Sequence, residues 1–235
     1  MARGVDAYSG GAKYNNSAIN AICIASTVDA LAAVRRLVYE EKKLKLSEFA
    51  AVLRDNWQGH AELRQTALHR MPKYGNGDPA VDALAAQVMR DTAACINGKP
   101  NGRGGVFRCG FFSIDYRLTF GEKTGEPLSK NMCAVTAMDR EGVTALIRSA
   151  TAVDYTDTPN GTVLDVVLYA GAVEGDAGIC AMETLLETFM ARRGFAMQIN
   201  VLSPAVLRAA QENPEKYATL QVRLCGWNVY FTCLL

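Results

Sequence analysis

Residues 219–235 read TLQVRLCGWNVYFTCLL and place a glycine inside an otherwise apolar and β-branched stretch. Val222, Leu224 and Val229 around this glycine predict a buried β-strand. A glycine inside a strand loses side-chain packing and backbone entropy, so it usually marks a bulge or a close approach to the backbone. Gly226 is therefore the residue whose presence most needs an explanation.

Size and charge bound the class of protein. The chain has 235 residues, 49% of them hydrophobic, which is enough for a sizeable core in one large or two small domains. Lysine and arginine number 25 against 24 aspartate and glutamate, so the net charge of +1 gives no long-range field for nucleic acid or a membrane. Neither partner is expected. Without a membrane-spanning apolar run or a signal peptide, a cytoplasmic location is expected.

Cysteine and histidine do not form a metal pattern. The seven cysteines are scattered and odd in number, which is typical of reduced thiols, and none forms a Cys-x-x-Cys pair. His60 and His69 have no carboxylate pattern between them and are interpreted as structural or surface residues. The glycine-rich stretches at 75–78 and 101–105 lack the context of a phosphate loop and are interpreted as turns.

The first hundred residues are predicted to be mostly helical. Apolar residues at helical spacing favour helices at residues 27–43 and 61–70, and Ser47 is expected to cap another helix between them. Asp78, followed by proline, predicts the start of a further long helix.

After a turn-rich break, strands and helices alternate. Strands separated by helices of about ten residues or more imply parallel β-α-β units. The sequence therefore predicts an α/β fold with a helical part at residues 1–104 and an α/β part at residues 105–235. Strands are expected at 106–120, 162–169, 195–202 and 220–227, and helices at 142–150, 177–193 and 203–211.

A Pro-Asn-Gly turn at residues 159–161 stands immediately before one predicted strand. Ligands tend to bind at turns at the mouth of a parallel sheet. A ligand-binding turn and a plain tight turn both remain open.

Residues 223–227, RLCGW, resemble the glycyl radical motif of the pyruvate formate-lyase family, Arg-Val-x-Gly-Tyr or a near variant followed by an aromatic strand. The resemblance covers nearly the whole chain. Its further landmarks, in the family's order, are GGAKYNN, RRLVYEEKKL, LRQTALHRMPKYGNGD, NGRGGVFRCGFFS, GEPLSKN, PNGTVLDVVL, MQINVLSP and NPEKYATLQ.

The resemblance implies the C-terminal part of a ten-stranded α/β barrel, in which a glycine loop meets a loop with a thiyl-forming cysteine. Gly226 would carry the radical, framed by Arg223, Cys225 and Trp227. A Cα radical is delocalised over the flanking amides only if the centre can flatten, which a Cβ would hinder. An apolar surrounding would protect it. Cys225 is not expected to be the catalytic thiol, because neighbouring side chains in an extended segment point to opposite sides.

The implied activity is that of a glycyl radical enzyme of anaerobic metabolism, of formate acetyltransferase, lyase or dehydratase type. An iron–sulfur radical S-adenosylmethionine activase would install the radical at Gly226, which would pass to a cysteine thiol and then to a small-molecule substrate. The chain would bind no separate cofactor or metal, and the complete enzyme would be a homodimer. The substrate is open among pyruvate with coenzyme A, diols, hydroxylated amino acids and quaternary amines.

The sequence departs from the family pattern in four places. The Gly-Cys-x-Glu stretch of the thiyl cysteine is absent, so the chain is expected to need a missing N-terminal half. Thr124 joins directly to Gly125, where relatives carry a longer loop near the active site, so substrate contacts are expected to be missing. The chain stops at Leu235, where relatives continue into a polar helix, and Trp227 replaces the commoner tyrosine.

Two alternatives stay open. The chain could be a spare subunit that replaces the glycine loop of an oxygen-damaged enzyme, or an inactive remnant. The long helical region at residues 27–95 exceeds what a replacement subunit needs, which favours part of a split or truncated enzyme. Unpaired barrel edges predict that the chain alone aggregates or oligomerises.

Overall fold

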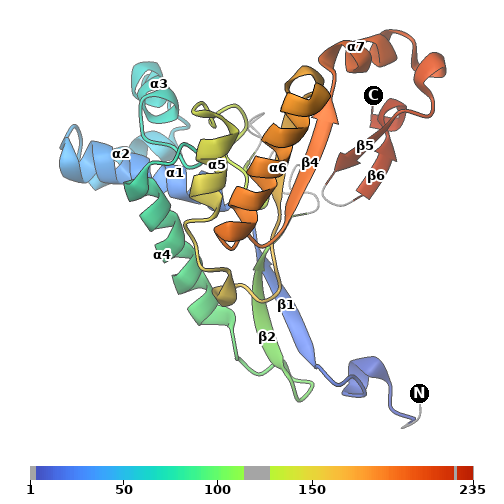
Figure 1. Ribbon diagram of the computed structural model, residues 1–235. Helices are drawn as coiled ribbons and strands as arrows, with labels where there is room; N and C mark the ends of the chain where they lie inside the picture. The colour runs from blue at the N-terminus through green and yellow to red at the C-terminus, as the bar shows by residue number, and fades with distance from the viewer. Residues whose placement is uncertain (1–3, 114–127, 225–226, 235) are drawn as a thin grey trace.

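The computed structural model describes residues 4–113, 128–224 and 227–234 (Figure 1). The described strands are β1 (Asn16–Ala21), β2 (Val106–Phe111), β3 (Leu164–Tyr169), β4 (Met197–Leu202), β5 (Gln221–Leu224) and β6 (Trp227–Tyr230). The described α-helices are α1 (Ile24–Val34), α2 (Leu46–Arg54), α3 (Ala61–His69), α4 (Pro79–Ile96), α5 (Gly142–Ala150), α6 (Gly175–Ala191) and α7 (Pro204–Glu212), and a π-helical segment, Arg35–Glu40, continues α1.

The strands form two parallel pairs and one antiparallel hairpin. β1 pairs with β2, and β3 pairs with β4, each in parallel. A parallel bridge joins Phe111, at the end of β2, to Thr162, which comes just before β3. The two pairs therefore continue one another in the order β1, β2, β3, β4. β5 and β6 form the hairpin, which pairs with itself in a separate sheet and is reached through α7 (Figure 1).

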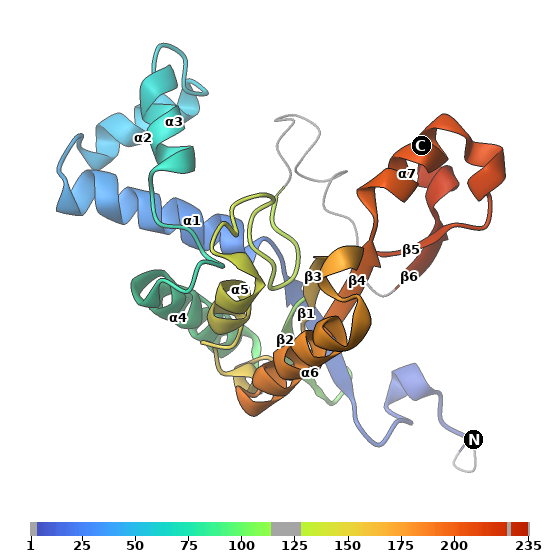
Figure 2. The ribbon, with the colours of Figure 1, turned by 45° about the horizontal axis from the view of Figure 1, so that its top comes forward.

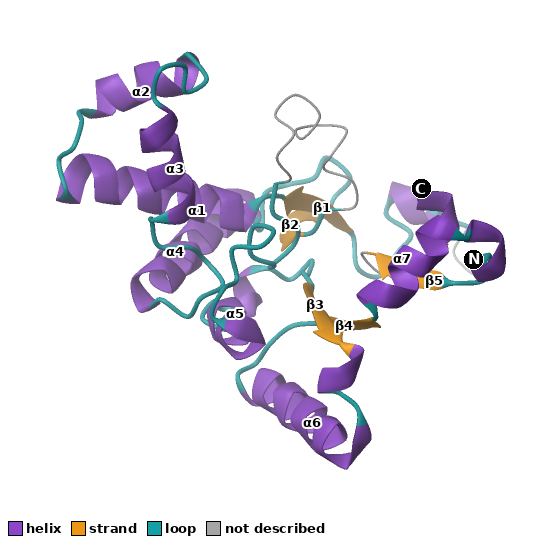
Figure 3. Cartoon of the chain, turned by 90° about the horizontal axis from the view of Figure 1, so that it is seen from above, coloured by secondary structure: helices purple, strands orange, loops and turns teal. Residues whose placement is uncertain are grey.

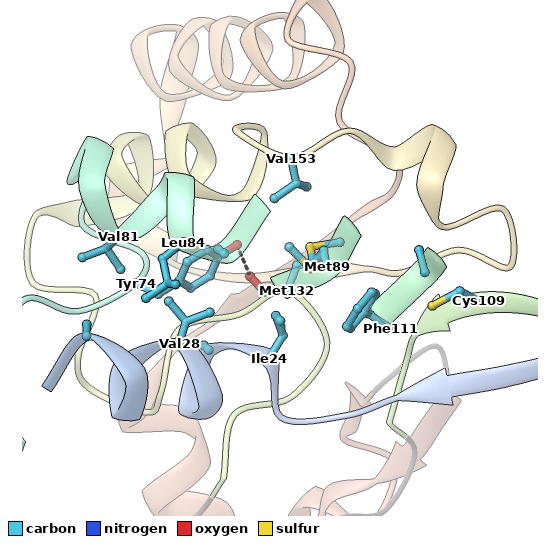
Figure 4. Packing of buried hydrophobic residues seen from close by; sticks show 14 residues of the cluster. Ile24, Val28, Tyr74, Val81, Leu84, Met89, Cys109, Phe111, Met132 and Val153 are labelled. Atoms are coloured by element: carbon cyan, nitrogen blue, oxygen red, sulfur yellow. Dashed lines mark hydrogen bonds between the residues drawn. The ribbon is translucent and has the colours of Figure 1, made fainter. Parts of the chain in front are cut away.

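The first core lies between the β1–β2 pair and the helices α1 and α4 (Figure 4). Tyr74 is fully buried at its centre, and its hydroxyl donates to the Met132 carbonyl at 3.4 Å. Residues of α1, α4 and β2 fill the space around it, which buries the end of β2 at Cys109 and Phe111. The main members are Ile24, Val28, Val81, Leu84, Met89, Cys109, Phe111 and Val153.

The second core lies between the β3–β4 pair and the helices α5 and α6, which lie beside this pair in Figures 2 and 3. Leu164 and Val166 of β3 are buried against Ile147 and Phe189. Because strand side chains alternate between faces, Asp165 lies on the opposite face of this sheet. A third, smaller cluster packs α2 and α3 against the end of α1.

Most predicted helices are confirmed. The Asp78 carboxylate accepts from the N–H of Ala80 at 2.9 Å and begins α4, and Ser203 caps α7 by accepting from the N–H of Val206. The predicted cap at Ser47 is wrong.

Helix α2 begins one residue before that serine. The N–H of Lys45 donates to the Glu48 carboxylate at 2.8 Å, which satisfies a free donor before the helix and moves its start.

The strand predictions need two corrections. β1 was not predicted, because its sequence NSAINA has little β-branched character, and its pairing with β2 forms it. The single strand predicted around Gly226 is wrong, because β5 and β6 are separate strands in which Leu224 pairs with Trp227. Residues 114–120 of the predicted strand at 106–120, and the junction of Thr124 with Gly125, lie outside the described residues.

Candidate functional site

The β5–β6 hairpin encloses in sequence the residue that the motif singles out. Gly226 itself, and Cys225 beside it, lie outside the described residues. The strands on either side are paired in register from Gln221 with Tyr230 to Leu224 with Trp227. The antiparallel ladder thus fixes the backbone immediately before and after the predicted site.

Arg223 connects both hairpin strands to β4. Its Nε donates to Oε1 of Gln198 at 3.3 Å, and Nε2 of Gln198 donates back to the Arg223 carbonyl at 3.4 Å. Its Nη1 donates to Oδ1 of Asn228, its register partner across the hairpin, at 3.1 Å. Of the predicted frame, Arg223 is therefore in contact with the neighbouring strand of the sheet.

Asp165 lies next to Gln198 in the register of β3 and β4, on the face turned away from α5 and α6. Its side chain is buried, and Oδ2 accepts from Nδ2 of Asn131 at 3.0 Å and lies 3.8 Å from Nζ of Lys130. Its Oδ1 is also buried and has no hydrogen-bond partner in the described part of the chain. A buried carboxylate oxygen without a donor retains an unused capacity to accept.

Asn131 organises this polar cluster. It is buried and has a left-handed φ of 46°, a conformation that asparagine tolerates better than most residues. Its Oδ1 accepts from the N–H of Ser113 at 2.9 Å, while its Nδ2 donates to Oδ2 of Asp165. The Ser113 hydroxyl is buried and is likewise without a partner among the described residues. Two unused polar groups thus flank one strained amide residue.

Cys133 lies against the same aspartate but is not suited to act as a thiolate. The N–H of Asp165 donates to its Sγ at 3.3 Å, and its thiol donates to the Asp165 carbonyl at 3.6 Å. Burial, followed by the Asp165 charge, raises the pKa of Cys133 to about 12. The thiol therefore stays protonated at neutral pH.

The Pro-Asn-Gly turn makes structural bonds. The Asn160 side chain donates to Oδ1 of Asn20 at 2.8 Å, and its N–H donates to the Cys109 carbonyl at 3.0 Å. The N–H of Phe111 donates to the Gly161 carbonyl at 3.0 Å. These bonds join β2 to the start of β3, which favours the interpretation as a tight turn.

The histidines and the glycine-rich stretch at residues 75–78 take part in local contacts. Nδ1 of His69 lies 3.2 Å from Nη2 of Arg140, and Oδ1 of Asn76 accepts from the N–H groups of Arg140 and Glu141. No group of three or more histidine, cysteine or acidic side chains in the described ranges could hold a metal ion. The described helices include none with the length and apolar character needed to span a membrane.

Sequence reasoning missed Gln198, Asn131 and Asp165. A signal for Asp165 was present, because a carboxylate interrupts the apolar run TVLDVVLY and cannot be buried without partners. Gln198 lies within the landmark MQINVLSP, but no local pattern marks its contact with β5, which spans 25 residues of sequence.

Two protein-family models match the sequence of this chain. The model described as Pyruvate formate lyase-like matches residues 1–121, and the model described as Glycine radical matches residues 128–232, which include Gly226. The chain belongs to the pyruvate formate-lyase family. The resemblance carried by the sequence motifs is confirmed.

Individual relatives and solved structures support the same family assignment. The (2S)-3-sulfopropanediol dehydratase of Klebsiella oxytoca is 33% identical over 98% of this chain and 30% of its own length. A solved glycyl radical enzyme from Archaeoglobus fulgidus matches with a TM-score of 0.90 at 35% identity, covering 98% of this chain and 30% of that one. The glycerol-bound B12-independent glycerol dehydratase from Clostridium butyricum matches with a TM-score of 0.88 at 31% identity, and the match covers 95% of this chain and 30% of that one.

The chain spans about 30% of the length of these relatives. The predicted fold, a part of the α/β barrel of the pyruvate formate-lyase family, is confirmed by these structures.

Proposed function

We propose that this chain supplies the radical-storing part of a glycyl radical enzyme, with the radical at Gly226. The observation that carries the proposal is the match of the glycine radical model to residues 128–232, within which RLCGW is the motif. The contacts of Arg223 support it, because they hold the strands on both sides of this glycine against β4. Cys225 and Trp227 complete the proposed frame.

The chemistry needs a hydrogen atom to leave Cα of Gly226. A radical S-adenosylmethionine activase with an iron–sulfur cluster would take that hydrogen and leave one unpaired electron on the backbone carbon. In turnover, Gly226 would regain a hydrogen atom from a cysteine thiol, which becomes a thiyl radical, and the thiyl radical would take hydrogen from the substrate. The residues of this chain supply placement and exclusion of water.

The thiyl cysteine is proposed to come from protein outside these 235 residues. None of the seven cysteines has the Gly-Cys-x-Glu surroundings, and the buried Cys133 packs against β3. The open face of the β3–β4 sheet also calls for a cover, because Val167 is 62% exposed and Tyr169 is 71% exposed there. That cover, and a second copy in a homodimer, are the proposed protein partners beside the activase.

We propose dehydration or a related elimination as the reaction class, with a small hydroxylated molecule as substrate. The support is that two relatives are named as dehydratases, one of (2S)-3-sulfopropanediol and one of glycerol. In the proposed division of labour, residues 1–104 provide the outer helical part, and residues 105–235 carry the radical segment.

The test is anaerobic. The chain is treated with a radical S-adenosylmethionine activase, S-adenosylmethionine and a reductant, and electron paramagnetic resonance is recorded. A doublet from the Cα hydrogen is expected, which collapses to a singlet when glycine is deuterated at Cα. Air should then cut the backbone at Gly226 and release a short C-terminal peptide.

A pair of glycine variants controls the test. Gly226→Ala should abolish both the signal and the cut, because a methyl group hinders the flat centre. Gly171→Ala should preserve both, because a Cβ at that exposed glycine has no atom within 4 Å. A doublet that survives in Gly226→Ala, or a cut elsewhere, would contradict the assignment.

A further inference from the structure

We propose that Gln198 is a positioning residue for the radical site, which holds the glycine-bearing hairpin at a fixed place beside the β3–β4 sheet. The inference rests on the proposed assignment of the radical to Gly226. It adds a residue of β4 that the glycyl radical motif does not contain.

A row of side chains at one level crosses four strands. Asp165 of β3 and Gln198 of β4 are register partners. Gln198 exchanges two hydrogen bonds with Arg223 of β5, and Arg223 bonds to Asn228, its register partner in β6. The row therefore reaches both strands that flank Gly226, three residues before it and two residues after it.

The amide of glutamine is suited to both contacts of this row. Its Oε1 accepts from Nε of Arg223, and its Nε2 donates to the Arg223 carbonyl. A carboxylate could only accept, and an ammonium could only donate. The bond to the carbonyl matters most, because it fixes the backbone of β5 as well as a flexible side chain.

Two hydrogen bonds, both between Arg223 and Gln198, join the described part of the hairpin to β4. In Figures 1 and 2 it lies beside β4 and is reached through α7, away from both helix-covered cores. The N–H of Phe231 donates to the Leu220 carbonyl at 2.8 Å, but this bond closes the hairpin upon itself. The contacts of Gln198, together with the packing of residues 231–234 against α7, therefore help to fix where the hairpin lies relative to β4.

The two hydrogen bonds of Gln198 are expected to stabilise the docked hairpin by a modest amount. The two bonds measure 3.3 and 3.4 Å and are exposed, so each is at the weak end of its class. Their joint loss should change the ratio of docked to undocked hairpin by about tenfold. Hydrogen transfer needs reacting atoms within roughly 3–3.5 Å, so even this change in the position of the hairpin should alter the rate of hydrogen transfer at Gly226.

The experiment compares Gln198→Ala with Asn200→Ala, a change two residues along the same face of β4. Amide hydrogen exchange is measured on the full chain before any radical is formed. Gln198→Ala should speed exchange in β5 and β6 by about tenfold, with β2 and α4 unchanged, whereas Asn200→Ala should leave all four as they were. Unchanged exchange of the hairpin in Gln198→Ala, or an equal rise in β2 and α4, would overturn the inference.

Gln198→Glu gives a second readout that loss of packing alone would not produce. At pH 7 its carboxylate can accept from Nε of Arg223, with charge assistance, but cannot donate to the Arg223 carbonyl, whereas the protonated acid can do both. Relative to Gln198→Ala at the same pH, hairpin protection should therefore be partly restored at pH 7 and more fully restored near pH 4, and protection that is independent of pH in this variant would count against the inference.

Radical formation separates the two proposals. After activation, Gln198→Ala should be cut by air several times faster at Gly226 than the unsubstituted chain, because its hairpin is less well held. An unchanged cutting rate would count against Gln198 as a positioning residue. If no radical forms in any variant while exchange behaves as expected, the proposed function fails and the contact of Gln198 with Arg223 stands.

Discussion

Replacing Asp29 by asparagine should stabilise the protein above about pH 6, although the residue is buried and hydrogen-bonded. Asp29 lies in α1 and is 6% exposed, and its Oδ1 accepts from the N–H of Tyr74 at 2.8 Å. Burial raises its pKa to about 6, against the opposing effects of the Tyr74 N–H and the Lys73 charge. The native state therefore holds this proton more tightly than the unfolded chain does.

The difference between the native and unfolded pKa of Asp29 gives the sign and size of its effect on the free energy of unfolding. A pKa raised from 3.8 to about 6 corresponds to about 3 kcal/mol, at about 1.36 kcal/mol for each pH unit. Because the native state binds more protons between these two values, the free energy of unfolding falls as pH rises from about 4 to about 6. Above pH 6 the whole cost of the buried charge is present. The side-chain amide in Asp29→Asn would keep an oxygen for the Tyr74 N–H without that charge.

The assay is urea unfolding of Asp29→Asn and the unsubstituted chain at pH 4, 6 and 8. The variant should gain about 1–3 kcal/mol at pH 8, less than the full amount because the attraction of Lys73 is also lost, and little at pH 4. Asp154→Asn is the control of opposite sign, because hydrogen bonds from Thr156 lower the pKa of that exposed carboxylate. An equal loss of stability in Asp29→Asn at all three pH values would refute the reasoning.

Two further substitutions test the packing that positions the site, each by denaturant unfolding. Gly110→Ala should destabilise the fold by about 1–3 kcal/mol, because its Cβ would lie 2.5 Å from Oδ1 of Asn20 and 2.9 Å from the Gly161 carbonyl; a neutral effect would show that this junction can move. Ser203→Ala should cost about 1 kcal/mol by removing the cap of α7, and Ser203→Thr should restore most of it; equal losses in both would argue against the cap.

Helix boundaries with a local cause could be predicted from the sequence. Asp78 followed by proline, and Ser203 followed by proline, carry their own capping chemistry, and both begin helices where expected. Ser47 has the same capping chemistry, but Glu48 takes the N–H of Lys45, so the helix starts earlier. The sequence contains both a capping serine and a glutamate that can bond to the N–H of Lys45, and a single sequence does not show which of the two sets the start of the helix.

Features that depend on pairing between distant segments could not be predicted. β1 is made of Asn, Ser, Ala and Ile and becomes a strand because β2, about 90 residues later, pairs with it. The RLCGW motif could be found from local letters, but its division between two strands depends on the pairing of Leu224 with Trp227. Gln198 and Asp165 come together with the motif only after β3, β4 and β5 have found one another.

The glycine-bearing hairpin is stabilised separately from the two cores. Among the described side chains of residues 219–234, Val222 is buried, and the others are half-buried or exposed. The described part of this segment therefore buries little apolar surface, and we expect it to open at a lower free energy than the cores between the sheet and the helices. Polar contacts such as those of Gln198 with Arg223 then contribute to its position. Substitutions of the exposed members of this row, Arg223 and Asn228, and of the half-buried Gln198 should therefore alter what happens at Gly226 while the unfolding of the whole chain stays nearly unchanged.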